Sequence, residues 1–185
     1  MIANIFTGSV IGIEGYKITV EVDITSTIPG FTIVGLPDAA VSEAKERVRS
    51  AIKNSGYSFP TKKIVVNLAP AHIKKEGSGF DLPIAIGILF SNGEINAEKV
   101  KETGFIGELS LDGSIRAVNG VLSITTGVKN EGLKKIFVPV ENAKEAALVD
   151  GIKVYPVENL TQVIEYFNSS VVSDFKIQPF SINIK

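Results

Sequence analysis

The sequence predicts an α+β fold. Three strand-like runs open the chain, over residues 2–13, 16–24 and 31–34, and the turn signals Glu14-Gly15 and Pro29-Gly30 separate them. In the second run apolar and polar residues alternate, which is typical of an antiparallel strand with one buried and one wet face. Helix and strand patterns alternate after these runs. Strands followed by mixed elements are typical of an α+β domain.

The region from residue 37 to 93 predicts a helix, a strand, a loop and a second helix. The first helix starts at Pro37-Asp38 and ends before Gly56, because apolar residues recur at helical spacing between them. A β-rich run over 63–68 and a loop over 71–81 follow. Leu82–Ser91 is apolar nearly all round, so we expect a buried helix, with Asp81 as its N-cap.

The second half predicts a hairpin followed by alternating helices and strands. We expect a strand over 104–111, a tight turn at Asp112-Gly113 and a returning strand over 114–118. The remaining expected elements are helices 119–131, 141–149 and 159–168 and strands 135–138 and 152–155. Residues 169–185 have no helical period and read as a linker or tail after a domain over 1–168.

Composition excludes several classes of site. The chain has 185 residues, a net charge of −1, no cysteine and one histidine, His72. These counts exclude a disulfide framework, a thiolate zinc site and a cysteine nucleophile, and we expect no metal or cofactor in this chain. The Gly-x-x-x-x-Gly-Lys-Ser/Thr motif is absent from the sequence, so we do not expect this chain alone to hydrolyse ATP.

No secretion or membrane signal is present in the sequence. The N-terminus lacks a basic region and an apolar core, and no apolar run approaches the roughly 18 residues of a membrane span. We therefore expect a cytoplasmic protein with no membrane partner.

The loop Lys74-Lys75-Glu76-Gly77-Ser78-Gly79-Phe80-Asp81 is the candidate site for chemistry, since it precedes a helix start. Ser78 as a nucleophile would need a base within hydrogen-bond reach, and Lys74 and Lys75 are the candidates. The residues favour the alternative, a glycine turn that leads into a helix while both lysines are solvated. His72, Glu76 and Asp81 match no familiar metal-ligand spacing.

Basic side chains are the candidate contacts to DNA or to a protein partner. Lys45, Arg49 and Lys53 recur at i, i+4 and i+8 on the first predicted helix, where Glu43 and Glu46 dilute their charge. A solvated helix face is therefore the favoured interpretation of this stripe. The full set of candidate contacts is Lys74, Lys75, Lys62, Lys63, Lys45, Arg49 and Lys53.

Four segments carry a resemblance to a known family: GLPDAAVSEAKERVRSAI, NLAPAHIKKEGSGFDLPIA, TGFIGELSLDGSIRAVNGV and IFVPVENAKEAALV. They resemble the N-terminal domain of the magnesium-chelatase-like AAA+ proteins of the ComM/YifB type, also called ChlI-like. The resemblance implies a ribosomal protein S5 domain 2-like fold, a two-layer β/α sandwich with a mixed sheet that is related to the Lon proteolytic domain.

The resemblance also implies a function. It implies a non-catalytic accessory domain whose parent chain continues past Lys185 into an AAA+ ATPase module that binds ATP and Mg. Such parents form homo-oligomeric rings and act as helicases in branch migration during DNA uptake and recombination. The domain would aid ring assembly or engage DNA.

Kinship with Lon offers the alternative of a serine peptidase. On the Lon motifs the nucleophile position falls on Gly79 and the base position on Ile124, while Ser78 takes the place of a proline. Neither glycine nor isoleucine can act as a nucleophile or a base. The resemblance therefore implies that proteolysis is disfavoured and that this chain has no catalytic residue.

Overall fold

The structure is a computed structural model that describes residues 1–169 and 179–183. The strands are β1 Ala3–Ile11, β2 Glu14–Thr25, β3 Gly30–Val34, β4 Lys63–Ala69, β5 Thr103–Phe105, β6 Glu108–Leu109, β7 Ile115–Arg116, β8 Lys135–Pro139 and β9 Lys153–Val157. The helices are α1 Ala39–Asn54, α2 Asp81–Ser91, α3 Val121–Asn130, α4 Ala143–Ala146 and α5 Leu160–Asn168, with short 3-10 turns at Ala97–Lys99 and Val140–Asn142. Most of the expected elements are present close to their expected bounds.

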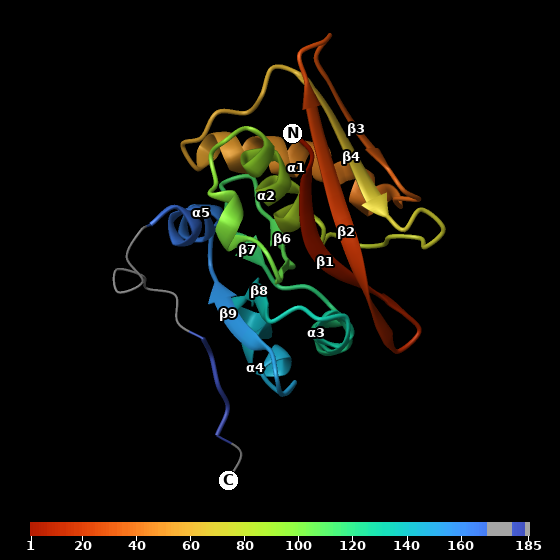
Figure 1. Cartoon of the computed structure of the whole chain (residues 1–185), viewed down its shortest axis with the longest axis vertical. Helices are drawn as coiled ribbons and strands as arrows, with labels where there is room; N and C mark the ends of the chain where they lie inside the picture. The colour runs from red at the N-terminus through yellow and green to blue at the C-terminus, as the bar shows by residue number, and fades with distance from the viewer. Residues whose placement is uncertain (170–178, 184–185) are drawn as a thin grey trace.

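One mixed sheet organises the chain (Figure 1). Its strand order is β3-β4-β2-β1-β5-β8-β9, and β6 and β7 form a separate two-stranded hairpin. The pairs β4–β2 and β2–β1 are antiparallel, and the pairs β3–β4, β1–β5, β5–β8 and β8–β9 are parallel. The structure thus has the mixed sheet that the resemblance implied.

Helices cover both faces of the sheet in its C-terminal half. In β8, Ile136 and Val138 belong to one buried cluster with α3 and α4, whereas Phe137 belongs to a second cluster with α1, α2 and α5. The expected two-layer sandwich is therefore wrong for this half, where strand side chains are buried on both faces. In β4 only alternate residues are buried, so that part of the sheet keeps a single helical layer.

The expected strand over 104–111 is split. β5 ends at Phe105, and the chain then turns toward α2, because the N–H of Gly107 donates to Gly79 and its carbonyl accepts from Leu82. β6 begins only after this turn, so the β6–β7 hairpin lies outside the main sheet (Figure 1). The expected helix over 141–149 is also shorter, a 3-10 turn followed by the four residues of α4.

Part of the predicted tail packs on the sheet edge. The N–H of Phe180 donates to the carbonyl of Val154 in β9 at 2.8 Å, and its side chain packs against the cluster under α3 and α4. Residues 170–178 and 184–185 of that tail lie outside the described residues.

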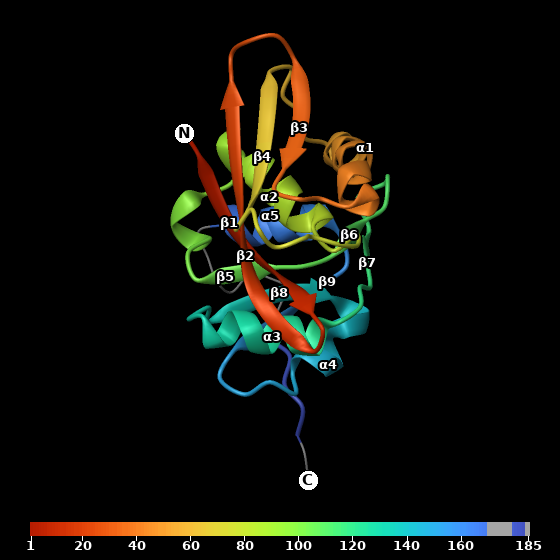
Figure 2. The ribbon, with the colours of Figure 1, turned by 90° about the vertical axis from the view of Figure 1, so that its right-hand side faces the viewer.

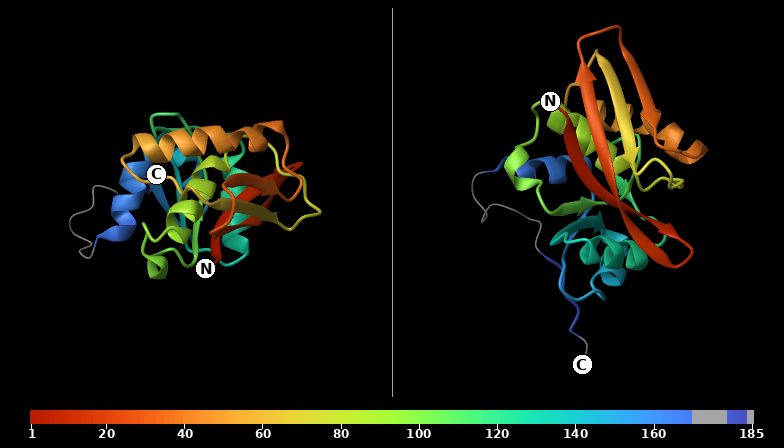
Figure 3. Two further views of the ribbon diagram at one scale, coloured as in Figure 1. Left: turned by 90° about the horizontal axis from the view of Figure 1, so that it is seen from above. Right: turned by 45° about the vertical axis from the view of Figure 1, so that its right-hand side comes forward.

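The tip of the β1–β2 hairpin packs backbone to backbone against α3 (Figures 2 and 3). A Cβ atom on Gly127 of α3 would lie 2.2 Å from the carbonyl oxygen of Gly15, and one on Gly15 would lie 1.8 Å from that of Ser123. Only glycine fits at these two positions, because the two carbonyl oxygens with which a Cβ would clash belong to the backbone and cannot move aside.

We therefore expect Gly127→Ala to destabilise the chain, although alanine is intrinsically the better helix residue by about 1 kcal/mol. The clash with Gly15 should cost roughly 1–3 kcal/mol in the free energy of unfolding measured by urea titration. Thr126→Ala, at an exposed position on the same helix, is the control and should stay within about 0.5 kcal/mol. A higher melting temperature for Gly127→Ala would contradict this packing.

Candidate functional site

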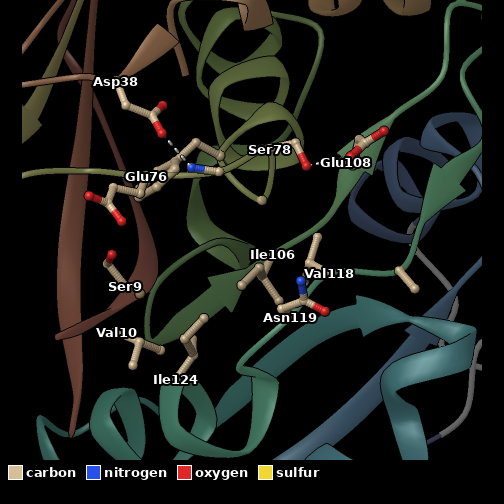
Figure 4. A pocket seen from close by; sticks show the side chains of 15 residues that line it. Ser9, Val10, Asp38, Glu76, Ser78, Ile106, Glu108, Val118, Asn119 and Ile124 are labelled. Atoms are coloured by element: carbon tan, nitrogen blue, oxygen red, sulfur yellow. Dashed lines mark hydrogen bonds between the residues drawn. The ribbon is translucent and has the colours of Figure 1, made fainter. Parts of the chain in front are cut away.

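A cavity of about 560 Å³ lies at the N-terminus of α2 (Figure 4). The residues around it come from β1, from the loop before α2, from the segment between β5 and β6, from the chain after β7 and from α3. They are Gly8, Ser9, Val10, Asp38, Glu76, Gly77, Ser78, Gly79, Phe80, Ile106, Glu108, Ala117, Val118, Asn119 and Ile124.

The structure brings together the two positions that the Lon resemblance assigns to the catalytic dyad. Gly79 and Ile124 are 45 residues apart in the sequence, yet both line this cavity (Figure 4). Neither side chain can carry a proton or attack a carbonyl. A Cβ on Gly79 would lie 3.2 Å from Cγ1 of Ile106, so the cavity is tight at this point.

Ser78 is held by a carboxylate. Its hydroxyl donates a short hydrogen bond to Oε2 of Glu108, and Figure 4 shows the two side chains facing each other. Lys74, one of the two lysines considered as the base, instead pairs with Glu76 at 3.3 Å. The arrangement that sequence reasoning considered, a serine activated by a loop lysine, is therefore not formed.

The prediction that Lys75 contacts DNA or a partner is wrong. Its side chain is fully buried, and its ammonium donates to the carbonyl oxygens of Gly35, at 2.8 Å, and Pro70. Burial lowers the pKa of Lys75 below its ordinary value. Gly35 and Leu36 both have positive φ, at 104° and 57°, so the lysine stabilises an otherwise strained turn.

Asp81 does not cap α2. The N-cap position is Phe80, and Asp81 is the first helical residue, fully buried and bound to Arg47 of α1. The guanidinium donates through Nε to Oδ2 at 2.6 Å and through Nη2 to Oδ1 at 3.0 Å. Oδ2 also accepts from the N–H of Leu109 at 3.0 Å. This bidentate pair connects α1, α2 and β6.

Opposing effects set the pKa of Asp81. Burial raises the pKa of its carboxyl, and the hydrogen bonds from Arg47 and from the N–H of Leu109 oppose that rise. The same pairing raises the pKa of Arg47. Sequence reasoning did not identify Arg47, although its position between the buried Ala44 and Ala51 on the apolar stripe was a signal of a buried partner.

A second hollow, of about 410 Å³, gathers part of the predicted basic set. Arg49 and Lys53 of α1 and Lys62, before β4, line it together with Phe59. The guanidinium of Arg49 lies over the Phe59 ring, 5.3 Å from its centroid. The complete lining is Pro29, Gly30, Arg49, Lys53, Phe59, Pro60, Thr61 and Lys62, which includes no acidic residue. We call it the basic hollow.

The other predicted contacts do not join this hollow. Lys45 and Lys63 are not part of its lining, and Lys74 lies in the loop beside the α2 cavity. Among residues 1–169 and 179–183, no group of three or more metal-ligating side chains is positioned to hold a metal ion. Within the same residues, no helix has the length and apolar character needed to cross a bilayer.

Residues 20–142 match the family model described as subunit ChlI of Mg-chelatase. The chain belongs to this family. It is 40% identical over 168 residues to the competence protein ComM of Haemophilus influenzae, and 46% identical over 147 residues to the uncharacterized protein YifB of Escherichia coli. These alignments cover 90% and 80% of this chain but only 33% and 29% of the relatives, so the chain spans about a third of their length.

A more distant similarity links this ChlI-type chain to proteases. Lon protease 2 of Bacillus subtilis is 27% identical over 141 residues, which is 75% of this chain and 24% of that protease. Gly79 and Ile124 meet in one cavity, as expected if the chain keeps a Lon-like arrangement without the reacting side chains.

The buried position of Lys75 predicts its chemical protection. In the folded chain we expect acetic anhydride to modify Lys74, whose side chain is 67% exposed, and to modify Lys75 at least about tenfold more slowly. Mass spectrometry of peptides from briefly treated protein measures both rates. In urea the two rates should converge. Equal rates in native buffer would show that Lys75 is on the surface.

Breaking the ion pair between Arg47 and Asp81 should lower the free energy of unfolding more at neutral pH than at acidic pH. Arg47→Met leaves a buried carboxylate unpaired, and we expect a loss of about 3 kcal/mol in the free energy of unfolding near neutral pH. Without Arg47 the pKa of Asp81 should rise further, so protonation relieves the penalty as the pH falls toward about 5.

Urea titrations at the two pH values measure this difference. Adding Asp81→Asn to Arg47→Met should recover part of the loss, because the unpaired charge is then gone. Arg116→Met, at an exposed position, is the control and should change little. A loss for Arg47→Met that is the same at both pH values would contradict the role assigned to Asp81.

Proposed function

We propose that this chain is a non-catalytic accessory domain of an AAA+ ATPase of the ComM type and that it engages DNA. Membership of the ChlI family and 40% identity to a competence protein support the proposal. In the proposed parent protein, a further module binds ATP and Mg and assembles into a homo-oligomeric ring. The domain itself then has the ribosomal protein S5 domain 2-like fold that Lon-type domains share.

The basic hollow is the observation that carries DNA engagement. It brings cations from two separate parts of the chain, Arg49 and Lys53 from α1 and Lys62 from the loop before β4, around an aromatic ring. Lysine and arginine contacts to phosphates supply most of the sequence-independent affinity for DNA. The half-buried ring of Phe59 lies beside them, and its accessible part can contact an unpaired base.

Peptide hydrolysis is the less favoured function. The α2 cavity is lined by Gly79 and Ile124, the positions that the Lon resemblance assigns to the dyad, and Ser78 is bonded to Glu108 rather than to a lysine. Three carboxylates on its lining also make this cavity unsuitable for a DNA phosphate.

Removing two cations from the basic hollow tests the proposal. The double variant Lys53→Gln with Lys62→Gln should bind duplex and single-stranded oligonucleotides more weakly, and the slope of log affinity against log salt should fall by about 2. Fluorescence anisotropy at several salt concentrations measures both quantities. Lys144→Gln with Lys153→Gln makes the same charge change at exposed positions on α4 and β9, and should bind as the unmodified chain does.

Two results would count against DNA engagement by this domain. One is an absence of binding by the unmodified chain at low salt, and the other is an equal loss of affinity in both double variants. Light scattering on the same samples would then show whether the chain self-associates, which is the expectation for a role in ring assembly.

A further inference from the structure

The cavity at the N-terminus of α2 has an acidic wall. Asp38, Glu76 and Glu108 are its charged lining residues, and no lysine or arginine belongs to the lining. Asp38 is already used internally, since its carboxylate accepts from the N–H groups of Val41 and Gly77. Glu76 pairs with the exposed Lys74 outside the lining, and Glu108 accepts from Ser78. The cavity therefore attracts cations and repels phosphate.

Ser9 adds an observation that is independent of the acidic residues. This residue of β1 is only 7% exposed, and its hydroxyl has no hydrogen-bond partner among the described residues. It lines the cavity, and Figure 4 shows its oxygen directed toward the side on which Glu76 lies. This oxygen is accessible from the cavity, so a polar group of a bound ligand can form a hydrogen bond with it.

The opposite wall of the cavity is apolar. Val10, Ile106, Val118 and Ile124 lie along one side in Figure 4, facing the carboxylates and hydroxyls. A guest that fits both walls has an aliphatic stem and a cationic head, as arginine and lysine side chains do. The volume of about 560 Å³ also falls in the usual range for small-ligand pockets, which is about 300–1,000 Å³.

The edge of β1 beside the cavity favours a polypeptide over a free amine. β2 pairs with β1 along its whole length, from Ala3 to Ile11, but the pairing with β5 is confined to Phe6 and Gly104. Backbone groups of Gly8, Ser9 and Val10 therefore have no strand partner on that side among the described residues. An extended segment can add to such an edge through its main chain.

We propose that this cavity binds an arginine or lysine side chain of an extended polypeptide segment whose backbone lies along the free edge of β1. The carboxylate of Glu76 and the hydroxyl of Ser9, which lie at the same end of the cavity in Figure 4, hold the cationic head, and the apolar wall packs on the stem. The Lon-like cavity would thus serve as a docking pocket. The proposal does not depend on DNA binding at the basic hollow.

Binding of short peptides tests the proposed arginine or lysine site directly. Acetyl-Gly-Arg-Gly-amide is titrated into the isotope-labelled chain and compared with the same peptide carrying citrulline, which has the shape of arginine without its charge. We expect the arginine peptide to shift the backbone amide signals of Ser9, Gly77 and Ser78. The citrulline peptide should bind at least about tenfold more weakly, because the charge-assisted hydrogen bonds are lost.

Variants locate the binding. Glu76→Gln keeps the side-chain shape and should weaken binding of the arginine peptide at least about tenfold. Glu141→Gln removes one exposed carboxylate elsewhere and should leave the affinity unchanged. Circular dichroism confirms that each variant is folded.

Four results would overturn the proposal. They are equal binding of the arginine and citrulline peptides, no binding of either at millimolar concentration, unchanged affinity in the Glu76→Gln variant, and binding of butylguanidinium as tight as that of the peptide. The last result would identify a site for free cations, to which the β1 edge contributes nothing.

Discussion

The ion pair between Arg47 and Asp81 is the constraint on which the candidate site depends. α2 is apolar nearly all round, so hydrophobic burial alone would not fix its rotation or its axial position. The guanidinium of Arg47 and the N–H of Leu109 bind the same carboxylate and thereby fix α2 relative to α1 and β6. A buried pair of this kind contributes more to register than to net stability.

The loop before α2 is held at both ends. At one end Lys75 binds the carbonyls of Gly35 and Pro70, and at the other Asp81 is bound by Arg47. Between these anchors, Gly77 donates to Asp38, and the carbonyl of Gly79 accepts from Gly107. The cavity is therefore preorganised, which lowers the entropic cost of binding a ligand.

Periodic patterns predicted the elements well, and long-range pairing accounts for most of the errors. The alternation in β2 and the helical spacing in α1 depend only on neighbouring residues, so they could be read directly. The buried state of Lys75 could not, because its partners lie up to 40 residues away. The same holds for Asp81, which resembles a cap in sequence, and for the strand that ends at Phe105 because residue 107 bonds to residues 79 and 82. Of the candidate contacts, Arg49, Lys53 and Lys62 line one hollow, and their convergence around Phe59 could be found only from the fold.

The net charge of −1 hides a separation of charge along α1. Its N-cap, Asp38, lines the acidic cavity, whereas Lys53 in its last turn lines the basic hollow. Both placements agree with the helix dipole, which favours negative groups at the N-terminus and positive groups at the C-terminus. A helix of 16 residues is about 24 Å long, more than two Debye lengths at physiological salt. The two surfaces can therefore bind ligands of opposite charge with little mutual interference, while the rigid helix fixes their relative orientation.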